Sequence, residues 1–263
     1  MNLFALSGLF ISISSLILIL IFLRFGSSKQ HRLWVLFNLS ILCWGIGTLI
    51  AGLSKSPAMA LLGWEIGLRG GVFISITFFH AVCVFCQINR KLLIVAAYLF
   101  GVLTNILFSF HLVFPQDALF LFNSIYYFRA SLIYIVIMCF WILSVGLSFY
   151  ELFKFFKSSR GLRRVQTAYL AIGASAGFFG GVLAHIPALG IAIYPIGNFG
   201  VSLYCIIVTY AILKYNLMDI RVATTRIGVF VVVYSLVLGI PFGIAILGKP
   251  WLMNFLGENW FWI

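Results

Sequence analysis

Long apolar runs alternate with short polar or basic stretches along almost the whole chain. A helix needs about 20 apolar residues to cross the hydrocarbon core of a membrane, and these runs reach that length. The pattern therefore predicts an all-α, polytopic membrane helical bundle with about eight transmembrane helices. The expected spans are 2–23, Leu33–Leu53, Ala60–Gln87, Leu92–Val113, Tyr126–Tyr150, Gln166–Ile186, Ile196–Leu213 and Ile227–Leu247.

Basic residues concentrate in every second loop between the expected spans. These loops hold 13 of the 17 lysines and arginines, whereas the opposite loops hold only Lys55 and Lys249. Because cytoplasmic loops retain positive charge, we expect the basic side to face the cytoplasm and the N-terminus to lie outside. With eight spans, both chain ends then lie on the outer side.

Composition agrees with a membrane protein and changes the interpretation of the net charge. A chain that is 63% hydrophobic and 8% charged has too little polar surface for a water-soluble globule. The formal net charge of +12 would suggest nucleic acid as a partner of a soluble protein, but here the charges lie in short loops between helices. We therefore expect the lipid bilayer as a partner and no nucleic acid.

No motif for catalysis stands out. The chain lacks a Gly-rich phosphate loop, a His-Glu-x-x-His motif and a nucleophile elbow, and its few acidic residues are scattered in depth. The longest loop, Glu151–Val165, reads as a helical extension followed by a basic turn, which leaves no room for a soluble domain. We expect no catalytic residues, no cofactor and no enzyme activity in these residues.

The five cysteines all lie within or at the ends of apolar runs, which predicts no disulfide framework. Cys83 and Cys86 form a Cys-x-x-Cys pair without a second pair or a nearby histidine cluster. Packing is favoured over metal binding for this pair, and no metal site is expected.

Some residues are expected to join helices to one another. Gly173, Gly177 and Gly181 recur every four residues and form a flat stripe on which another helix can pack closely. Three asparagines within spans are expected to make hydrogen bonds between helices: Asn38, Asn105 and Asn198.

Charged residues within spans are costly, so they are candidates for function. Glu65 and Arg69 are four residues apart and can pair on one helix face. Arg129 and His185 are expected at a similar depth in the outer half, so the four could form a ligand-sensing or signal-sensing cluster. A structural ion pair with an arginine that reaches the interface is the alternative. His80 lies about 22 Å further along the helix axis and cannot join this cluster.

The stretch Arg163–Val222 carries a resemblance to a known family. It contains a basic pair, a Gly-rich span, a turn bounded by Pro187 and Pro195, a span that ends in YAILKY, and then NLMDIRV. Weaker matches are HRLWVLFNLSILCWGIG at His31–Gly47 and WEIGLRGGVFISITFFH at Trp64–His80. In this order, the three segments resemble the N-terminal seven-transmembrane sensor region of bacterial histidine kinases and related signalling proteins.

The resemblance implies a sensor in the bacterial inner (cytoplasmic) membrane that belongs to a two-component system. It implies a homodimer, a small ligand between the helices, and a kinase or cyclase output module in cis or in trans. Kinase activity would then reside in soluble domains that follow the membrane region. Helix movement would reach the output through the residues Tyr215, Asp219 and Arg221.

The expected organisation has three parts. Residues 1–217 form the seven-helix sensor region, 218–226 a cytoplasmic interfacial linker, and 227–263 an eighth span with a short aromatic tail, after which the chain is expected to stop before further spans or an output domain. The alternative function is a small multi-pass transporter or permease-like protein. Such a protein would use the Gly/Pro region Gly180–Gly200 as a site at the membrane midplane.

Overall fold

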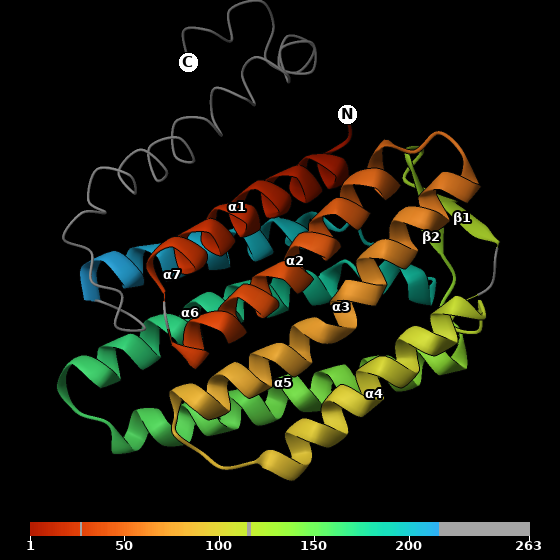
Figure 1. Cartoon of the computed structure of the whole chain (residues 1–263). Coiled ribbons are helices and arrows are strands. Elements are labelled where there is room, and N and C mark those ends of the chain that lie inside the picture. The colour runs from red at the N-terminus through yellow and green to blue at the C-terminus, as the bar shows by residue number, and fades with distance from the viewer. Residues whose placement is uncertain (27, 115–116, 216–263) are drawn as a thin grey trace, which may run out of the picture. The chain divides into compact units, whose positions relative to one another are not determined.

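A computed structural model describes residues 1–26, 28–114 and 117–215, which belong to one compact unit. Six helices in these residues are long and apolar enough to cross a membrane, and a shorter apolar helix accompanies them. The prediction of an all-α polytopic bundle is confirmed (Figure 1). The helices are α1 (Leu3–Phe25), α2 (Lys29–Leu53), α3 (Pro57–Phe85), α4 (Lys91–Ser109), α5 (Leu132–Ser158), α6 (Gly161–Leu183) and α7 (Phe199–Tyr215).

Part of the sequence-based prediction lies outside the described residues. This holds for the eighth span Ile227–Leu247, for the linker 218–226, and for two of its residues, Asp219 and Arg221.

Polar caps define where several helices begin. A side-chain oxygen at the residue before the helix accepts a hydrogen bond from a backbone N–H of the first turn, which would otherwise have no partner. This cap occurs at Asn2 before α1, Ser28 before α2, Ser56 before α3 and Ser131 before α5.

Contacts between neighbouring helices arrange six of them as a closed ring. Around this ring, α1 contacts α2, α2 contacts α3, α3 contacts α5, α5 contacts α6, α6 contacts α7, and α7 returns to α1. The remaining helix, α4, packs on α3 from outside the ring. The side chains that face the middle of this ring are therefore the ones that can form a site between helices.

Glycines bring α2 and α3 into close contact. A Cβ atom added at Gly47 would lie 2.4 Å from the backbone nitrogen of Gly67 and 2.5 Å from the carbonyl oxygen of Gly63. Such small residues let two backbones approach within a membrane, where dispersion contacts replace the hydrophobic effect as the main attraction between helices. The sequence prediction did not identify this contact.

A small β-hairpin interrupts the helical pattern between α4 and α5. Strands β1 (Ala118–Leu121) and β2 (Ile125–Phe128) pair in antiparallel register. The turn between them holds Phe122 and Asn123 in the left-handed region, with φ of 57° and 50°. Two consecutive residues with positive φ give the turn the twist that a short hairpin connection requires.

The prediction that the fifth span begins at Tyr126 was wrong. Tyr126 lies in β2, and α5 runs from Leu132 to Ser158 instead. A short apolar and aromatic stretch fits a strand as well as a helix, so hydrophobicity alone did not separate β2 from the span that follows. The interpretation of Glu151–Val165 as a helical extension and a turn is confirmed, because α5 extends to Ser158 and α6 begins at Gly161.

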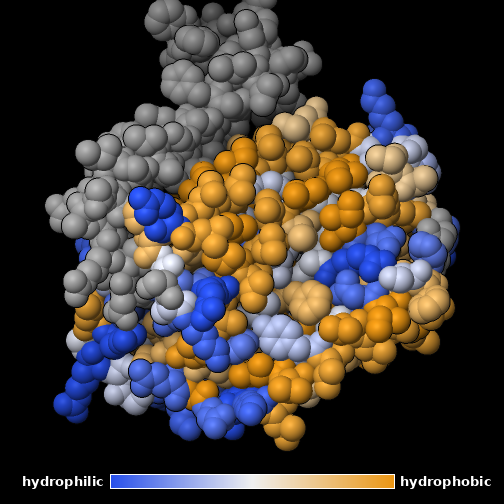
Figure 2. All heavy atoms as spheres, viewed as in Figure 1, coloured by the Kyte–Doolittle hydropathy of each residue, from blue (hydrophilic) through white to orange (hydrophobic). Residues whose placement is uncertain are grey.

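The N-terminus lies at the same end of the bundle as the hairpin. The Asn2 side-chain amide donates to the carbonyl oxygens of Gly52 and Ser124, at 2.8 and 3.1 Å. The backbone N–H of Phe4 donates to the Tyr194 hydroxyl at 3.2 Å. We call this end the hairpin end. The opposite end, where α3, α5 and α7 finish and Arg90, Lys157 and Lys214 lie, is called the basic end. Figure 2 shows a largely hydrophobic surface along the helices, with hydrophilic groups gathered at the lower left.

The charge distribution predicts which end faces the cytoplasm. A reporter fused after Lys157, near the basic end, should report a cytoplasmic location, and one fused after Lys55 should report an exterior location. Alkaline phosphatase and green fluorescent protein fusions would measure this. The reverse pattern would contradict the predicted orientation.

Candidate functional site

A cavity, which we call the central cavity, lies between α2, α3, α5, α6 and α7, and Phe108 of α4 also contributes to its lining. Its volume is about 50 Å³. One water needs about 10–15 Å³ of such volume, so the cavity has room for several small groups. Among the described residues, its lining contains no Lys, Arg, Asp or Glu. The lining is rich in rings, namely Phe37, Trp44, Phe108, Tyr134, Trp141, Phe178, His185 and Tyr204.

A histidine–tyrosine pair provides the most polar part of the lining. His185 follows the end of α6, and its Nδ1 lies 2.6 Å from the Tyr134 hydroxyl of α5. The Trp44 ring is 4.9 Å from the His185 ring, centre to centre, and Trp141 is 6.5 Å away. The described residues give the second ring nitrogen of His185 no hydrogen bond.

The hairpin holds the segment that carries His185. The Tyr127 hydroxyl donates to the carbonyl oxygen of Ala184 at 3.2 Å, and the Ala130 N–H donates to that of Ala188 at 2.9 Å. Burial raises the pKa of the Tyr127 phenol well above its usual value, so this hydroxyl stays protonated and keeps donating. The hairpin thus positions both ends of the turn around His185.

Trp44 connects the cavity to the beginning of α7. Its indole Nε1 donates to the Asn198 side-chain oxygen at 3.0 Å, and the Asn198 amide donates to the Ser7 hydroxyl at 2.8 Å. Asn198 is fully buried, so this bridge between α2, α1 and the start of α7 is shielded from lipid and water. The predicted interhelical hydrogen bond of Asn198 is confirmed.

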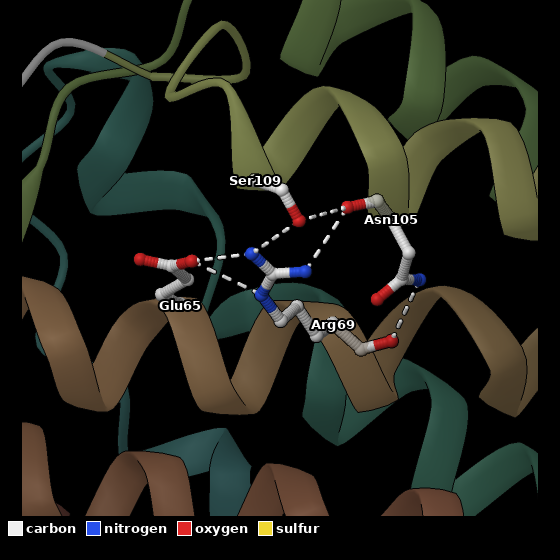
Figure 3. A network of polar contacts seen from close by, with 4 residues as sticks. All are labelled: Glu65, Arg69, Asn105 and Ser109. Atoms are coloured by element: carbon white, nitrogen blue, oxygen red, sulfur yellow. Dashed lines mark hydrogen bonds and ion pairs between the residues drawn. The ribbon is translucent and has the colours of Figure 1, made fainter.

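Glu65 and Arg69 form the predicted ion pair on α3 (Figure 3). Arg69 Nη2 lies 2.6 Å from Glu65 Oε1, and Nη1 donates to the carbonyl oxygen of Asn105 at 3.0 Å. Nη2 also donates to the Ser109 hydroxyl at 3.2 Å, and the Asn105 amide donates to the Arg69 carbonyl at 3.4 Å. This network joins α3 to α4 and confirms an interhelical hydrogen bond for Asn105. The third predicted asparagine, Asn38, donates to Trp34 of its own helix.

The four predicted sensing residues do not form one cluster. His185 lines the cavity, whereas Glu65 lies beside a second, smaller pocket that shares only Phe108 with it. The Arg69 guanidinium lies over the Phe108 ring, 5.6 Å from its centre. Arg129 is exposed after the end of β2. A sensing role for these residues stays a prediction, and the cavity is the geometry that can hold a ligand.

A family model for the N-terminal 7TM region of histidine kinase matches residues 7–221. The chain belongs to this family. The search of curated proteins gives no match, and the search of solved structures gives none either. The match confirms the resemblance and extends it toward the N-terminus, because it includes most of α1 and all of α2 to α7. The chain is thus a multi-pass membrane protein that contains the sensor region of a histidine kinase.

The glycine stripe of this 7TM region packs α6 against α7. Cβ atoms added at Gly173, Gly177 and Gly181 would meet side chains of α7 at 3.1 to 3.7 Å. The closest approach lies beside the stripe, at Gly180, where an added Cβ would lie 2.2 Å from the carbonyl oxygen of Gly197. The sequence held a signal for this contact, since Gly180 directly precedes a stripe residue.

An ion pair at the basic end of the 7TM region was not predicted. Arg90 donates from Nε and Nη2 to Glu151 Oε1, at 3.0 and 2.7 Å, and only 4% of the Glu151 side chain is exposed. These bonds raise the pKa of the Arg90 guanidinium, so it keeps its charge. The pair ties the α3–α4 turn to α5. A glutamate beside loops rich in basic residues was the available signal.

Hydrogen bonds connect the final turn of α7 to α6. The Gln166 amide donates to the carbonyl oxygen of Tyr215 at 2.9 Å, and the Tyr169 and Tyr215 hydroxyls lie 3.4 Å apart. Of the three residues predicted to pass helix movement to the output, only Tyr215 is among the described residues. In the matched 7TM region, α7 therefore leads from the Asn198 bridge, along the cavity, to this contact at the basic end.

Proposed function

We propose that this 7TM region detects a signal at its central cavity and passes it along α7 to a cytoplasmic output module. The observation that carries the proposal is the Trp44–Asn198 hydrogen bond, which couples the cavity lining to the start of α7. The proposal includes a homodimer in the bacterial inner membrane and a kinase or cyclase output in cis or in trans. Catalysis would occur in that output module.

The geometry of α7 suits such a role. Val201 and Tyr204 of this helix line the cavity, and its last residue, Tyr215, lies at the basic end. A helix of 17 residues is about 25 Å long, so a displacement at the cavity would be carried over most of the bilayer core. A signal needs only to favour one of two α7 positions over the other.

The transporter alternative receives no comparable support from geometry. It required the Gly180–Gly200 region to interrupt helices at the midplane. In the structure, two short 3₁₀ helices, η1 (Ile186–Leu189) and η2 (Ile196–Asn198), lie between the end of α6 and the start of α7. The irregular segment is thus a connection at the hairpin end.

A matched pair of tryptophan variants tests the proposal in a fusion of the chain with a histidine-kinase core. Trp44→Phe keeps an aromatic side chain but removes the donor to Asn198, and it should change the basal autophosphorylation rate by about 5-fold or more. Trp64→Phe is the control. Trp64 is equally buried, donates from Nε1 to the Tyr126 carbonyl at 2.9 Å and does not line the cavity.

The control should leave the rate within about 2-fold of the parent, although both variants lose one hydrogen bond of similar strength. Equal effects of the two variants would contradict the proposed route through Asn198. Substrate uptake by the unfused chain in sealed vesicles would instead favour the transporter.

A further inference from the structure

We propose that the central cavity binds a small, uncharged ring compound that carries one hydroxyl group, with phenol as the minimal example. This inference shares its cavity with the proposed function. It does not otherwise rest on that function, because the compound can bind without producing a signal. Charge, shape and hydrogen bonding each restrict the ligand.

The charge of the lining excludes ionic ligands. Among the lining residues there is no Lys, Arg, Asp or Glu that could compensate an ion. Moving an isolated charge from water into an apolar site costs far more free energy than moving a neutral polar group. An uncharged ligand is therefore the only class that this lining can accept without large rearrangement.

The shape of the lining favours a planar ring. Trp44, Trp141 and Phe178 approach the cavity from three different helices, and Phe178 packs edge-on against Trp141 with 5.3 Å between ring centres. Aromatic pairs in offset or edge-to-face geometry gain about 0.5–1.5 kcal/mol beyond area burial.

The hydrogen-bonding groups select a hydroxyl. His185 Nδ1 is engaged by Tyr134 Oη, and within the described residues Nε2 has no partner. If Tyr134 donates to Nδ1, then Nε2 carries the proton and donates; if Nδ1 donates to Tyr134, then Nε2 accepts. A ligand hydroxyl can satisfy either tautomer.

Calorimetric titration of the purified chain in detergent tests the inference with three single-ring probes: phenol, toluene and benzoate. Heats from protein-free micelles are subtracted. Phenol should bind about 5-fold more tightly than toluene, which corresponds to one neutral hydrogen bond. Benzoate should not bind, because its charge has no partner. Equal affinities for phenol and toluene, or tighter binding of benzoate, would overturn the inference.

A matched pair of histidine variants assigns the hydrogen bond. His185→Phe should reduce phenol affinity to the level of toluene, while toluene affinity changes little. His80→Phe is the control, because His80 contacts Tyr98 of α4 and does not line the cavity. Retained preference for phenol in a folded His185→Phe protein would refute the assignment.

If His185→Phe fails to fold, Ala174→Leu provides a second test. Ala174 lines the cavity and is buried, so the larger side chain fills the space and should abolish binding of both phenol and toluene. Unchanged binding in this variant would place the probe elsewhere and overturn the inference.

The result of these binding experiments can be distinguished from the result of the kinase-fusion experiment. Binding without any effect on output would count against the proposed function alone, whereas a Trp44→Phe effect without phenol binding would count against the ligand alone.

Discussion

Gly180→Ala should destabilise the bundle more than any other single-methyl addition at a glycine of α6. The added Cβ would lie 2.2 Å from the Gly197 carbonyl oxygen and 2.9 Å from the Gly200 Cα. Both are backbone atoms, so the clash can be relieved only by separating α6 from α7. Overpacking of this kind costs about 1–3 kcal/mol or more, which should lower the melting temperature in detergent by about 5 °C or more.

Gly146→Ala is the matched control for this prediction. Gly146 lies within α5, and an added Cβ there meets no atom within 4 Å. Because alanine favours a helix interior by up to about 1 kcal/mol over glycine, this variant should be neutral or slightly stabilised. Equal melting temperatures for the two variants would show that α6 and α7 do not approach as closely as described.

Arg69→Gln should strongly reduce insertion and stability, and the double change Glu65→Gln with Arg69→Gln should recover much of the loss. Without Arg69, the Glu65 carboxylate remains within a span and loses the cation 2.6 Å away. An uncompensated charge in a transmembrane helix costs about 2.5–3.5 kcal/mol at the helix centre, and somewhat less for these partly exposed side chains. Yield of folded protein and melting temperature measure the effect.

Glu65→Gln alone should be milder than Arg69→Gln. Arg69 would keep its hydrogen bonds to the Asn105 carbonyl and the Ser109 hydroxyl on α4, so its charge would retain polar partners. The opposite ranking of the two single variants would contradict the network in Figure 3. The same variants in the kinase fusion address the sensing prediction. A folded Glu65→Gln protein with normal output would leave Glu65 and Arg69 a structural role only.

The charge swap that combines Glu65→Arg with Arg69→Glu should destabilise the protein, although it keeps both charges on the same helix. A carboxylate at position 69 would face the Asn105 carbonyl oxygen, where the arginine now donates, and two acceptors repel each other. The neighbour on α4 is 36 residues away in the chain, so the sequence predicted an interhelical hydrogen bond for Asn105 but did not identify Arg69 as its partner.

Local patterns along the chain were enough to predict the class of fold, most of the span boundaries, the i,i+4 ion pair and the family. These features depend on local properties, because the length of an apolar run decides whether it can cross a membrane and the spacing along a helix decides which residues share a face. The prediction failed at β2, where an apolar stretch of four residues suits either a strand or a helix.

Which residues meet across helices could be seen only in the folded protein. There, His185 lines the cavity and pairs with Tyr134 beside Trp44, away from the Glu65–Arg69 pair. The Asn198 bridge and the close contact at Gly180 likewise join segments that are distant in the chain. Depth in the membrane can be estimated from position along a span, but the lateral neighbours of a helix cannot. Those neighbours are set by close packing of small residues and by hydrogen bonds between segments far apart in the chain, and neither leaves a periodic pattern in the sequence.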